Sequence, residues 1–253
     1  MNKDYQANLK IGDTVRINSI GRVTIGNYTK NTWNLTPETL DGAGQTLTID
    51  QAKYFYFGID DVDTAQQSPK VRGDFMKEAA WGFADATDEF LATTLAAGVS
   101  SANTLTARTV GADDNDAYEL LVDINTALSK TNTPRNDRFC VVNPDFVGVL
   151  LKDPRFVSFG TEGNLRRAMT GDFMETLVGF KLYTSNNVPV SGSEYTILAG
   201  YKGACTYAES IPEGQPEAIR VEGGFADAVK GLHVYGAKVT RPNNIVKCAV
   251  TIA

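Results

Sequence analysis

Residues 46–60, TLTIDQAKYFYFGID, form an unusually long strand-like run near the N-terminus. Leu47 and Phe55 fall on one face of an alternating pattern, and Tyr54 and Tyr56 fall on the other. A period of two residues is typical of a β-strand. At about 3.3 Å per residue the run would span roughly 45–50 Å, whereas most strands have only about five or six residues. A strand of this length is too long to lie entirely on the core of its own domain.

A second strand-like stretch, residues 14–25, lies upstream of this run. The polar residues 26–45 separate the two and contain a turn signal at Asp41–Gly42. The pattern therefore predicts a two-stranded arm that includes residues 14–59. Because an isolated hairpin is only marginally stable in water, we expect the arm to lie on another molecule.

The composition limits the classes of protein to which the chain can belong. With 253 residues, 42% hydrophobic and 21% charged, the chain has the size and composition of one large or two small soluble domains. No run approaches the ~18 apolar residues of a membrane span, and the N-terminus shows no apolar signal-peptide region. Three cysteines without CxxC spacing fit a reducing compartment. A net charge of −6 disfavours a dedicated nucleic-acid-binding protein.

A long amphipathic helix is predicted over residues 71–97, where Phe75, Phe83 and Phe90 keep the spacing of one face. Gly98 is a plausible stop signal. Such a helix would be about 40 Å long, well above the average of about 11–12 residues. A long arm beside a long helix indicates an elongated subunit rather than a compact enzyme.

The remaining elements are shorter. We expect a second helix over residues 117–129, and a buried strand over 138–144 that Asn143–Pro144 turns into a short helix. Further strands are expected at 179–185, 194–201 and 217–223. The C-terminus has the pattern of a hairpin, with strands at 232–240 and 245–252 and a turn at 241–244.

Catalytic motifs are nearly absent. A Ser-His-Asp or Cys-His site would have to use His233, the single histidine, whose strand pattern with Tyr235 favours a packed or surface-face position instead. Zinc sites usually need clustered His and Cys. The sequence contains neither a Walker loop nor a nucleophile elbow. We therefore expect no enzymatic activity and no cofactor.

Two other features have alternative interpretations. Asp60, Asp61 and Asp63 could bind Ca²⁺ or Mg²⁺, but they precede the long helix and would stabilise its positive end. They also lack the Gly and the Glu of a calcium loop, so no metal site is expected. The aromatic run 54–57 could stack nucleic-acid bases, but Lys53 is the only basic neighbour, which favours a core or intersubunit contact.

The ordered set of segments resembles a known family. It includes GDTVRINSIGRVTIGNYT, LTIDQAKYFYFGIDDVDTAQ, FADATDEFLA, RFCVVNPDFVGVLLKDPRF, VGFKLYTSNNVP and GAKVTRPNNIVKCAV. In this order, over nearly the whole chain, they are similar to major capsid proteins of tailed bacteriophages with the Hong Kong 97-like fold, a coat protein family related to the P22-type coat.

The resemblance implies an α+β fold with an extended β-hairpin (the E-loop), a long spine helix, and peripheral and axial domains. The implied division is a short N-terminal segment and E-loop at 1–62, a peripheral domain at 63–108 plus about 212–253, and an axial domain at 109–211. The E-loop would contact a neighbouring subunit, and the residues expected at that contact are Tyr28, Lys30, Trp33, Leu35, Leu40, Lys53 and Phe55.

By this resemblance, many copies would assemble into hexamers and pentamers of an icosahedral shell that encloses double-stranded DNA. The implied partners are portal and scaffolding proteins and packaged DNA bound without sequence specificity, with no membrane. The subunit would belong to the virion and pass through the host cytoplasm during assembly. Two alternatives remain open: an encapsulin-like compartment without a genome, and a soluble α+β enzyme.

Overall fold

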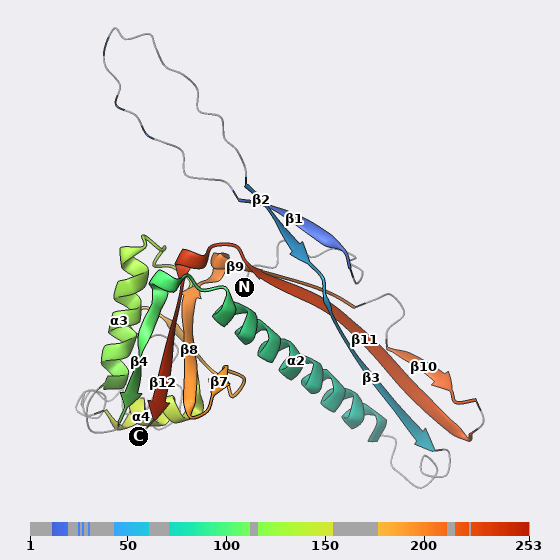
Figure 1. Ribbon diagram of the computed structural model, residues 1–253. Helices are drawn as coiled ribbons and strands as arrows, with labels where there is room; N and C mark the ends of the chain where they lie inside the picture. The colour runs from blue at the N-terminus through green and yellow to red at the C-terminus, as the bar shows by residue number, and fades with distance from the viewer. Residues whose placement is uncertain are drawn as a thin grey trace.

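The structure is a computed structural model that describes residues 12–19, 25, 27, 30, 43–60, 71–111, 116–153, 177–211, 216–222 and 224–252. The subunit is elongated and has two lobes (Figure 1). One lobe consists of a long sheet with the helix α2 (Val71–Ala97) beside it. The other is built on a six-stranded sheet with the helices α3 (Asp116–Lys130) and α4 (Pro144–Lys152). A separate two-stranded hairpin lies at the outer corner of the long sheet.

The long strand-like run is two strands that belong to different sheets. β2 (Ala43–Thr48) pairs antiparallel with β1 (Thr14–Ser19), whereas β3 (Gln51–Asp60) pairs with β11 (Ala226–Val239). The prediction that residues 51–59 belong to the arm is therefore wrong.

Gly236 of β11 provides the physical reason for the break. A Cβ at Gly236 would lie 2.4 Å from the carbonyl oxygen of Thr48 and 3.1 Å from the Cα of Ile49. The backbone between β2 and β3 therefore crosses β11 in direct contact with it. At this crossing the chain leaves the hairpin and enters the long sheet.

The long sheet is centred on β11, which has β3 on one side and β9 (Cys205–Ser210) and β10 (Glu217–Arg220) on the other. The predicted long helix is confirmed as α2 (Val71–Ala97). A row of aromatic rings joins α2 to the sheet, with centroid distances of 5.7 Å for Phe75–Phe57, 5.4 Å for Phe83–Phe55 and 5.4 Å for Phe90–Tyr235. Aromatic pairs at such distances add specific contact energy to the burial of apolar area.

The hairpin base packs on the opposite face of the long sheet. Ile17, Leu47 and Ile49 form a buried cluster with Ala208 of β9 and Val234 of β11. Successive side chains of a strand point to opposite faces, so Val234 lies on the face away from its neighbours His233 and Tyr235. The sheet is thus covered by α2 on one side and partly by the hairpin base on the other.

The second lobe contains the larger core. Its strands follow the order β4-β12-β8-β5-β6, with β7 beside β8. Their bounds are β4 Thr104–Val110, β5 Arg138–Val142, β6 Lys181–Thr184, β7 Val190–Ser191, β8 Glu194–Tyr201 and β12 Ile245–Ile252. The helices α3 (Asp116–Lys130) and α4 (Pro144–Lys152) confirm the two shorter predicted helices and bury Leu120, Leu121, Ile124, Phe146 and Leu150 against this sheet.

The predicted C-terminal hairpin is wrong. β11 lies in the long sheet, whereas β12 pairs with β4 and β8 in the six-stranded sheet. The short 3₁₀ helix η4 (Pro242–Asn244) carries the chain between the lobes, and the backbone N–H groups of Thr240 and Arg241 both donate to the carbonyl of Ala204. These bonds fix the turn in a direction that keeps β12 away from β11.

The sheets also bear on the expected division into domains, which stays a prediction. β4 and β12, expected in the peripheral domain, are hydrogen-bonded in the same sheet as β5, β6 and β8. β9, expected in the axial domain, pairs with β11 in the long sheet. The crossing points between the lobes therefore lie near residues 98–104, 202–205 and 240–245.

Candidate assembly surfaces

The hairpin is attached to the subunit by its base. Six residue pairs, from Thr14 with Thr48 to Ser19 with Ala43, form the β1–β2 ladder. The base is buried, since the exposed fractions are 4% for Ile17 and 0% for Leu47. Beyond the ladder Ile25 is 94% exposed. Single exposed apolar side chains are common on protein surfaces, so Ile25 is a candidate contact because it lies in the arm beyond the paired strands.

The predicted contact residues are divided between two elements. Lys30 is exposed and lies in the arm, whereas Lys53 and Phe55 lie on β3 in the long sheet, so their expected place in the arm is wrong. Phe55 is half-buried and packs within the subunit against Phe83. The remaining four, Tyr28, Trp33, Leu35 and Leu40, lie outside the described residues. That these seven side chains contact another subunit stays a prediction.

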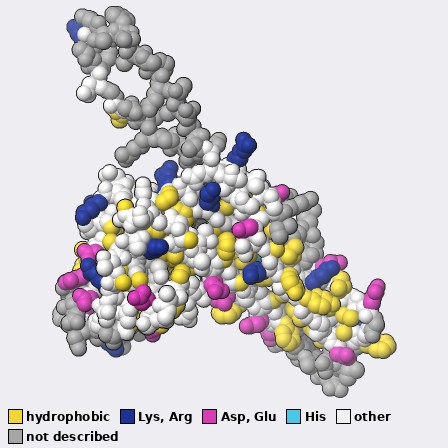
Figure 2. All heavy atoms as spheres, viewed as in Figure 1, with side chains coloured by type: hydrophobic (Ala, Val, Ile, Leu, Met, Phe, Trp, Pro, Cys, Tyr) yellow, Lys and Arg dark blue, Asp and Glu magenta, His cyan; other side chains and the backbone are white. Residues whose placement is uncertain are grey.

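The aromatic run 54–57, expected at a core or intersubunit contact, is divided between the two faces of β3. Tyr54 is 77% and Tyr56 is 55% exposed, on the face of β3 away from α2. Their direct cross-strand partners are Leu232 and Lys230 of β11. The signal was present in the sequence, because aromatic residues occupy both faces of the run 54–57 and only one face can pack under α2. Figure 2 shows hydrophobic side chains gathered over the end of the molecule where β3 and β10 end and β11 begins.

His233 occupies a packed position, one of the two non-catalytic positions expected for it. It is 8% exposed, and its ring lies between Phe83 and Tyr235, with centroid distances of 5.6 Å and 5.0 Å. Its Nε2 is 3.3 Å from Oε2 of Glu209, and the Tyr207 hydroxyl donates to the same oxygen at 2.7 Å. Burial, and next the hydrogen bond to Glu209, raise the pKa of Tyr207. This cluster holds α2 against the sheet.

The thiol and acidic groups of the described residues show no arrangement suited to metal binding. All three cysteines are free and buried. Within the described ranges, no group of three or more His, Cys, Asp or Glu side chains could hold a metal ion. Of the acidic group expected before the long helix, Asp60 ends β3, whereas Asp61 and Asp63 lie outside the described residues. None of the helices in the described part of the chain is long and apolar enough to cross a bilayer.

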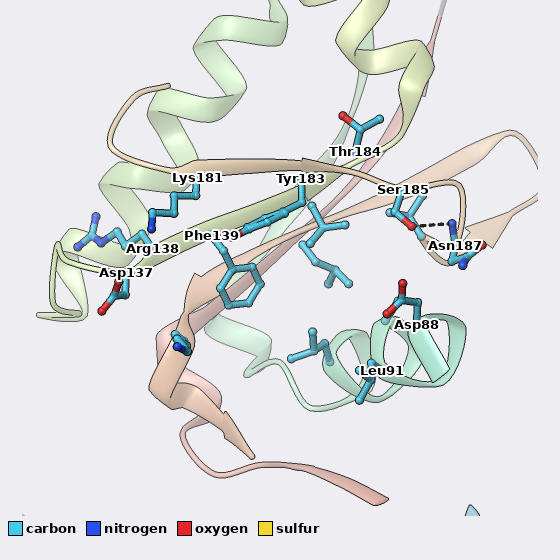
Figure 3. A pocket seen from close by; sticks show the side chains of 16 residues that line it. Asp88, Leu91, Asp137, Arg138, Phe139, Lys181, Tyr183, Thr184, Ser185 and Asn187 are labelled. Carbon is cyan, nitrogen blue, oxygen red and sulfur yellow. Dashed lines mark hydrogen bonds between the residues drawn. The ribbon is translucent and has the colours of Figure 1, made fainter. Parts of the chain in front are cut away.

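A groove of about 490 Å³ lies between the C-terminal half of α2 and the six-stranded sheet (Figure 3). Asp88 and Leu91 of α2 line one side, and Phe139 of β5 lines the other. Asn187 bridges the lobes here, because its side-chain N–H donates to Oδ1 of Asp85 at 2.7 Å.

The match to the phage capsid protein family model covers residues 44–248. A solved structure of Mycobacterium phage Che8 has 27% identity and a TM-score of 0.77, and the alignment covers 98% of this chain and 88% of that one. The capsid of Ralstonia phage GP4 has 11% identity and a TM-score of 0.75, with 99% and 86% covered. The holo-SrpI encapsulin complex from Synechococcus elongatus has 11% identity and a TM-score of 0.60, with 96% and 83% covered. No match is found among curated proteins.

An elongated α+β subunit with a helix beside a long sheet and an attached hairpin is the class of subunit that builds capsid shells, and the expected Hong Kong 97-like fold is confirmed. This chain belongs to the phage capsid protein family. It is a coat protein that forms an icosahedral bacteriophage head, so its role is structural and many copies associate in the virion.

Proposed function

We propose that the shell is assembled from hexamers and pentamers through the hairpin arm, which reaches across to a neighbouring subunit. The observation that carries this proposal is the packing of the hairpin base on the long sheet, with Ile25 94% exposed beyond the paired strands. Burying an isoleucine side chain contributes about 1.5–3 kcal/mol. The expected contacts are Tyr28, Lys30, Trp33, Leu35 and Leu40 of the arm.

Tyr54 and Tyr56 are the proposed receiving surface on the neighbour, beside Leu232 of β11. Tyrosine is enriched among the side chains that dominate binding energy at protein interfaces. Among the described strands, β3 pairs with β11 only, so its second edge can accept backbone hydrogen bonds from an extended segment.

The shell would enclose double-stranded DNA without sequence-specific contacts. A net charge of −6 suits a wall that confines DNA without binding it tightly. Portal and scaffolding proteins are the further proposed partners, and assembly would take place in the host cytoplasm.

An arm-shortening variant tests the proposal. Residues 21–41 are replaced by Asn-Gly, which joins Ile20 to Gly42 by a two-residue turn and keeps all six pairs of the β1–β2 ladder. We expect thermal unfolding of the monomer to be nearly unchanged, because long surface loops affect folding only weakly. Particle formation, followed by sedimentation and electron microscopy, should be lost.

A control variant replaces residues 21–41 by a Gly/Ser loop of equal length. If the arm acts through its side chains, this variant should also fail to assemble. Assembly of the shortened protein at the parent level would show that the arm is not an assembly contact.

The receiving surface is tested by the double substitution Tyr54→Ser and Tyr56→Ser. Tyr183 of β6 is 55% exposed on the other lobe, so Tyr183→Ser is a matched control. We expect the double variant to fold and remain unassembled, and the control to form particles. Equal assembly of both would refute the assignment of this surface.

A second candidate is an encapsulin-like compartment, which the similarity to the SrpI encapsulin complex favours at the level of the fold. Particles purified from producing cells distinguish the two functions. Nuclease-protected DNA inside them supports a phage head, whereas a co-purified protein cargo without DNA supports a compartment.

A further inference from the structure

The helix α2 has an outer face that nothing in the described part of the chain covers at its centre. Its inner face contributes Phe75, Phe83 and Phe90 to the contact with the long sheet. On the outer face Trp81 is 66% exposed. A tryptophan in water is an unusual surface residue and a frequent anchor of protein interfaces.

Carboxylates surround this tryptophan. At 100° per residue, five acids lie within about 80° of Trp81 around the helix: Asp74, Glu78, Asp85, Asp88 and Glu89. The one base on this face is Lys77, which is ion-paired with Asp74 at 3.1 Å. Five acids and one lysine give this face, here called the Trp81 stripe, a net charge of −4. Figure 2 shows acidic side chains along the edge of the molecule where α2 lies.

The acids of the stripe repel one another. Burial, and then the charge of neighbouring Asp85, raise the pKa of Asp88. Asp85 accepts a hydrogen bond from Asn187, a neutral group that cannot compensate the charge. A cation placed over this part of the stripe would therefore be stabilised by at least two carboxylates.

The stripe leads directly into the groove between the lobes. Asp88 belongs to both, and Leu91 and Leu95 continue from it along α2 into the groove. Phe139 and Leu198 provide apolar surface opposite them. In Figure 3, Asp88 and Leu91 lie on α2 at one side, and the cavity opens between them and Phe139. From Asp74 to Leu95 the continuous surface is roughly 32 Å long.

We propose that the Trp81 stripe and the adjoining groove bind a basic amphipathic segment of another polypeptide. Its Lys and Arg side chains lie against the carboxylates of the stripe and over the Trp81 ring, where cation–π attraction adds to the ion pairs. Its apolar side chains lie between Leu91 and Phe139. Double-stranded DNA is excluded as the occupant because its phosphates would face a surface of the same charge.

This surface lies on α2, so the proposal does not depend on the hairpin arm and can be tested on the unassembled subunit. The chain has two tryptophans, Trp33 and Trp81, so Trp33→Phe leaves Trp81 as the only tryptophan reporter. The probe is a helical peptide with Leu on one face and Lys on the opposite face. It has about 14 residues and is roughly 21 Å long. The same peptide with Glu in place of Lys is the charge control.

We expect the Lys peptide to shift the Trp81 emission to the blue, with affinity falling by at least about tenfold as salt screens the charges. The Glu peptide should leave the emission unchanged. A shift produced by a short DNA duplex instead would overturn the proposal. So would a shift that appears without peptide as the protein concentration rises, since the occupant would then be a second copy of this chain.

Substitutions separate a specific site from general charge attraction, with affinity measured by the anisotropy of a labelled Lys peptide. The triple variant Glu78→Gln, Asp85→Asn and Glu89→Gln should bind at least about tenfold more weakly. Trp81→Ala, which retains all charges, should also bind the peptide about tenfold more weakly.

The matched control, Asp145→Asn, Glu194→Gln and Glu222→Gln, changes the net charge equally at exposed positions outside α2 and should bind like the parent. Thermal unfolding confirms that each variant is folded. If the control variant lost as much affinity for the Lys peptide as the triple variant, or if Trp81→Ala bound with the affinity of the parent, no defined site would exist.

Discussion

The ring of Phe55 lies directly against Gly231 on the neighbouring strand. The two residues are paired across β3 and β11, and a Cβ at position 231 would lie 2.4 Å from Cε1 of the ring. This close approach lets Phe55 contact both Phe57 and Phe83, with centroid distances of 5.8 Å and 5.4 Å. The attachment of α2 to the long sheet therefore depends on the missing side chain of Gly231.

Gly231→Ala should lower the free energy of unfolding by about 1–3 kcal/mol, because the added methyl group displaces the Phe55 ring from Phe83. Urea unfolding measures the change. Gly44→Ala on β2 is the control, since a Cβ there would meet no atom within 4 Å. Equal stability of both variants would show that Phe55 can move without loss of contact.

Val178→Asn should raise the free energy of unfolding by about 1 kcal/mol. Val178 has a φ of 51°, and Gly179 after it has a φ of 80°. The two residues form a tight turn that is closed by two backbone hydrogen bonds between Leu177 and Phe180. A β-branched residue is strained in this region, whereas Asn-Gly is the favoured pair for such a turn. Val178→Ile keeps the branch and should give no gain in a thermal unfolding comparison. A gain of the same size in both variants would contradict the assignment to backbone strain.

Arg138→Lys should lower the free energy of unfolding by about 2–4 kcal/mol. Arg138 is 3% exposed and donates to the carbonyls of Pro134 and Thr133 and to the Asn125 side chain. The single ammonium group of lysine cannot reach all of these acceptors, so buried carbonyls lose their partners.

The control for Arg138 is Arg108→Lys, at an exposed ion pair with Asp123. Exposed pairs of this kind contribute at most about 1 kcal/mol. If Arg138→Lys lowers the free energy of unfolding no more than Arg108→Lys does, then lysine can replace arginine in the buried hydrogen-bond network.

The stability of the protein should fall as the pH rises above about 9. Burial raises the pKa of the Cys140 thiol from an ordinary value of 9.0 to about 12. Burial is also the main cause that raises the pKa values of Cys205 and Cys248 to about 11. Between these values the unfolded thiols lose their protons and the folded ones keep theirs, so rising pH favours the unfolded chain.

The difference between parent and Cys140→Ala unfolding curves from pH 8 to 11 isolates the contribution of Cys140. The parent should lose stability more steeply, and parallel curves would contradict the buried-thiol account. In the same way, a thiol reagent at pH 8 should modify the cysteines only after denaturant is added.

The helices could be predicted from the sequence because each carries its own signals. The spacing of Phe75, Phe83 and Phe90 predicts α2, and Asn143 before Pro144 predicts the start of α4, where the Asn143 side chain accepts from the backbone N–H of Phe146. These signals act over three to eight residues, so they do not depend on the rest of the fold.

The partners of the strands could not be predicted in the same way. Alternation identified residues 46–60 and 232–252 as strands, but it says only which side chains share a face. The division between β2 and β3 depends on the contact of Thr48 with Gly236, which are 188 positions apart in the chain. The separation of β11 from β12 depends on the bonds from Thr240 and Arg241 to Ala204.

The sequence by itself determined the helices, the strand-forming segments and the resemblance to phage coat proteins, because these follow from local periodicity and from residues in a fixed order. Only the tertiary structure decided which strands pair, that Phe55 packs inward while Tyr54 and Tyr56 face solvent, and that the exposed face of Trp81 leads into a groove. Those relationships join residues that are distant in the chain, and the free energy of packing, rather than local propensity, selects them.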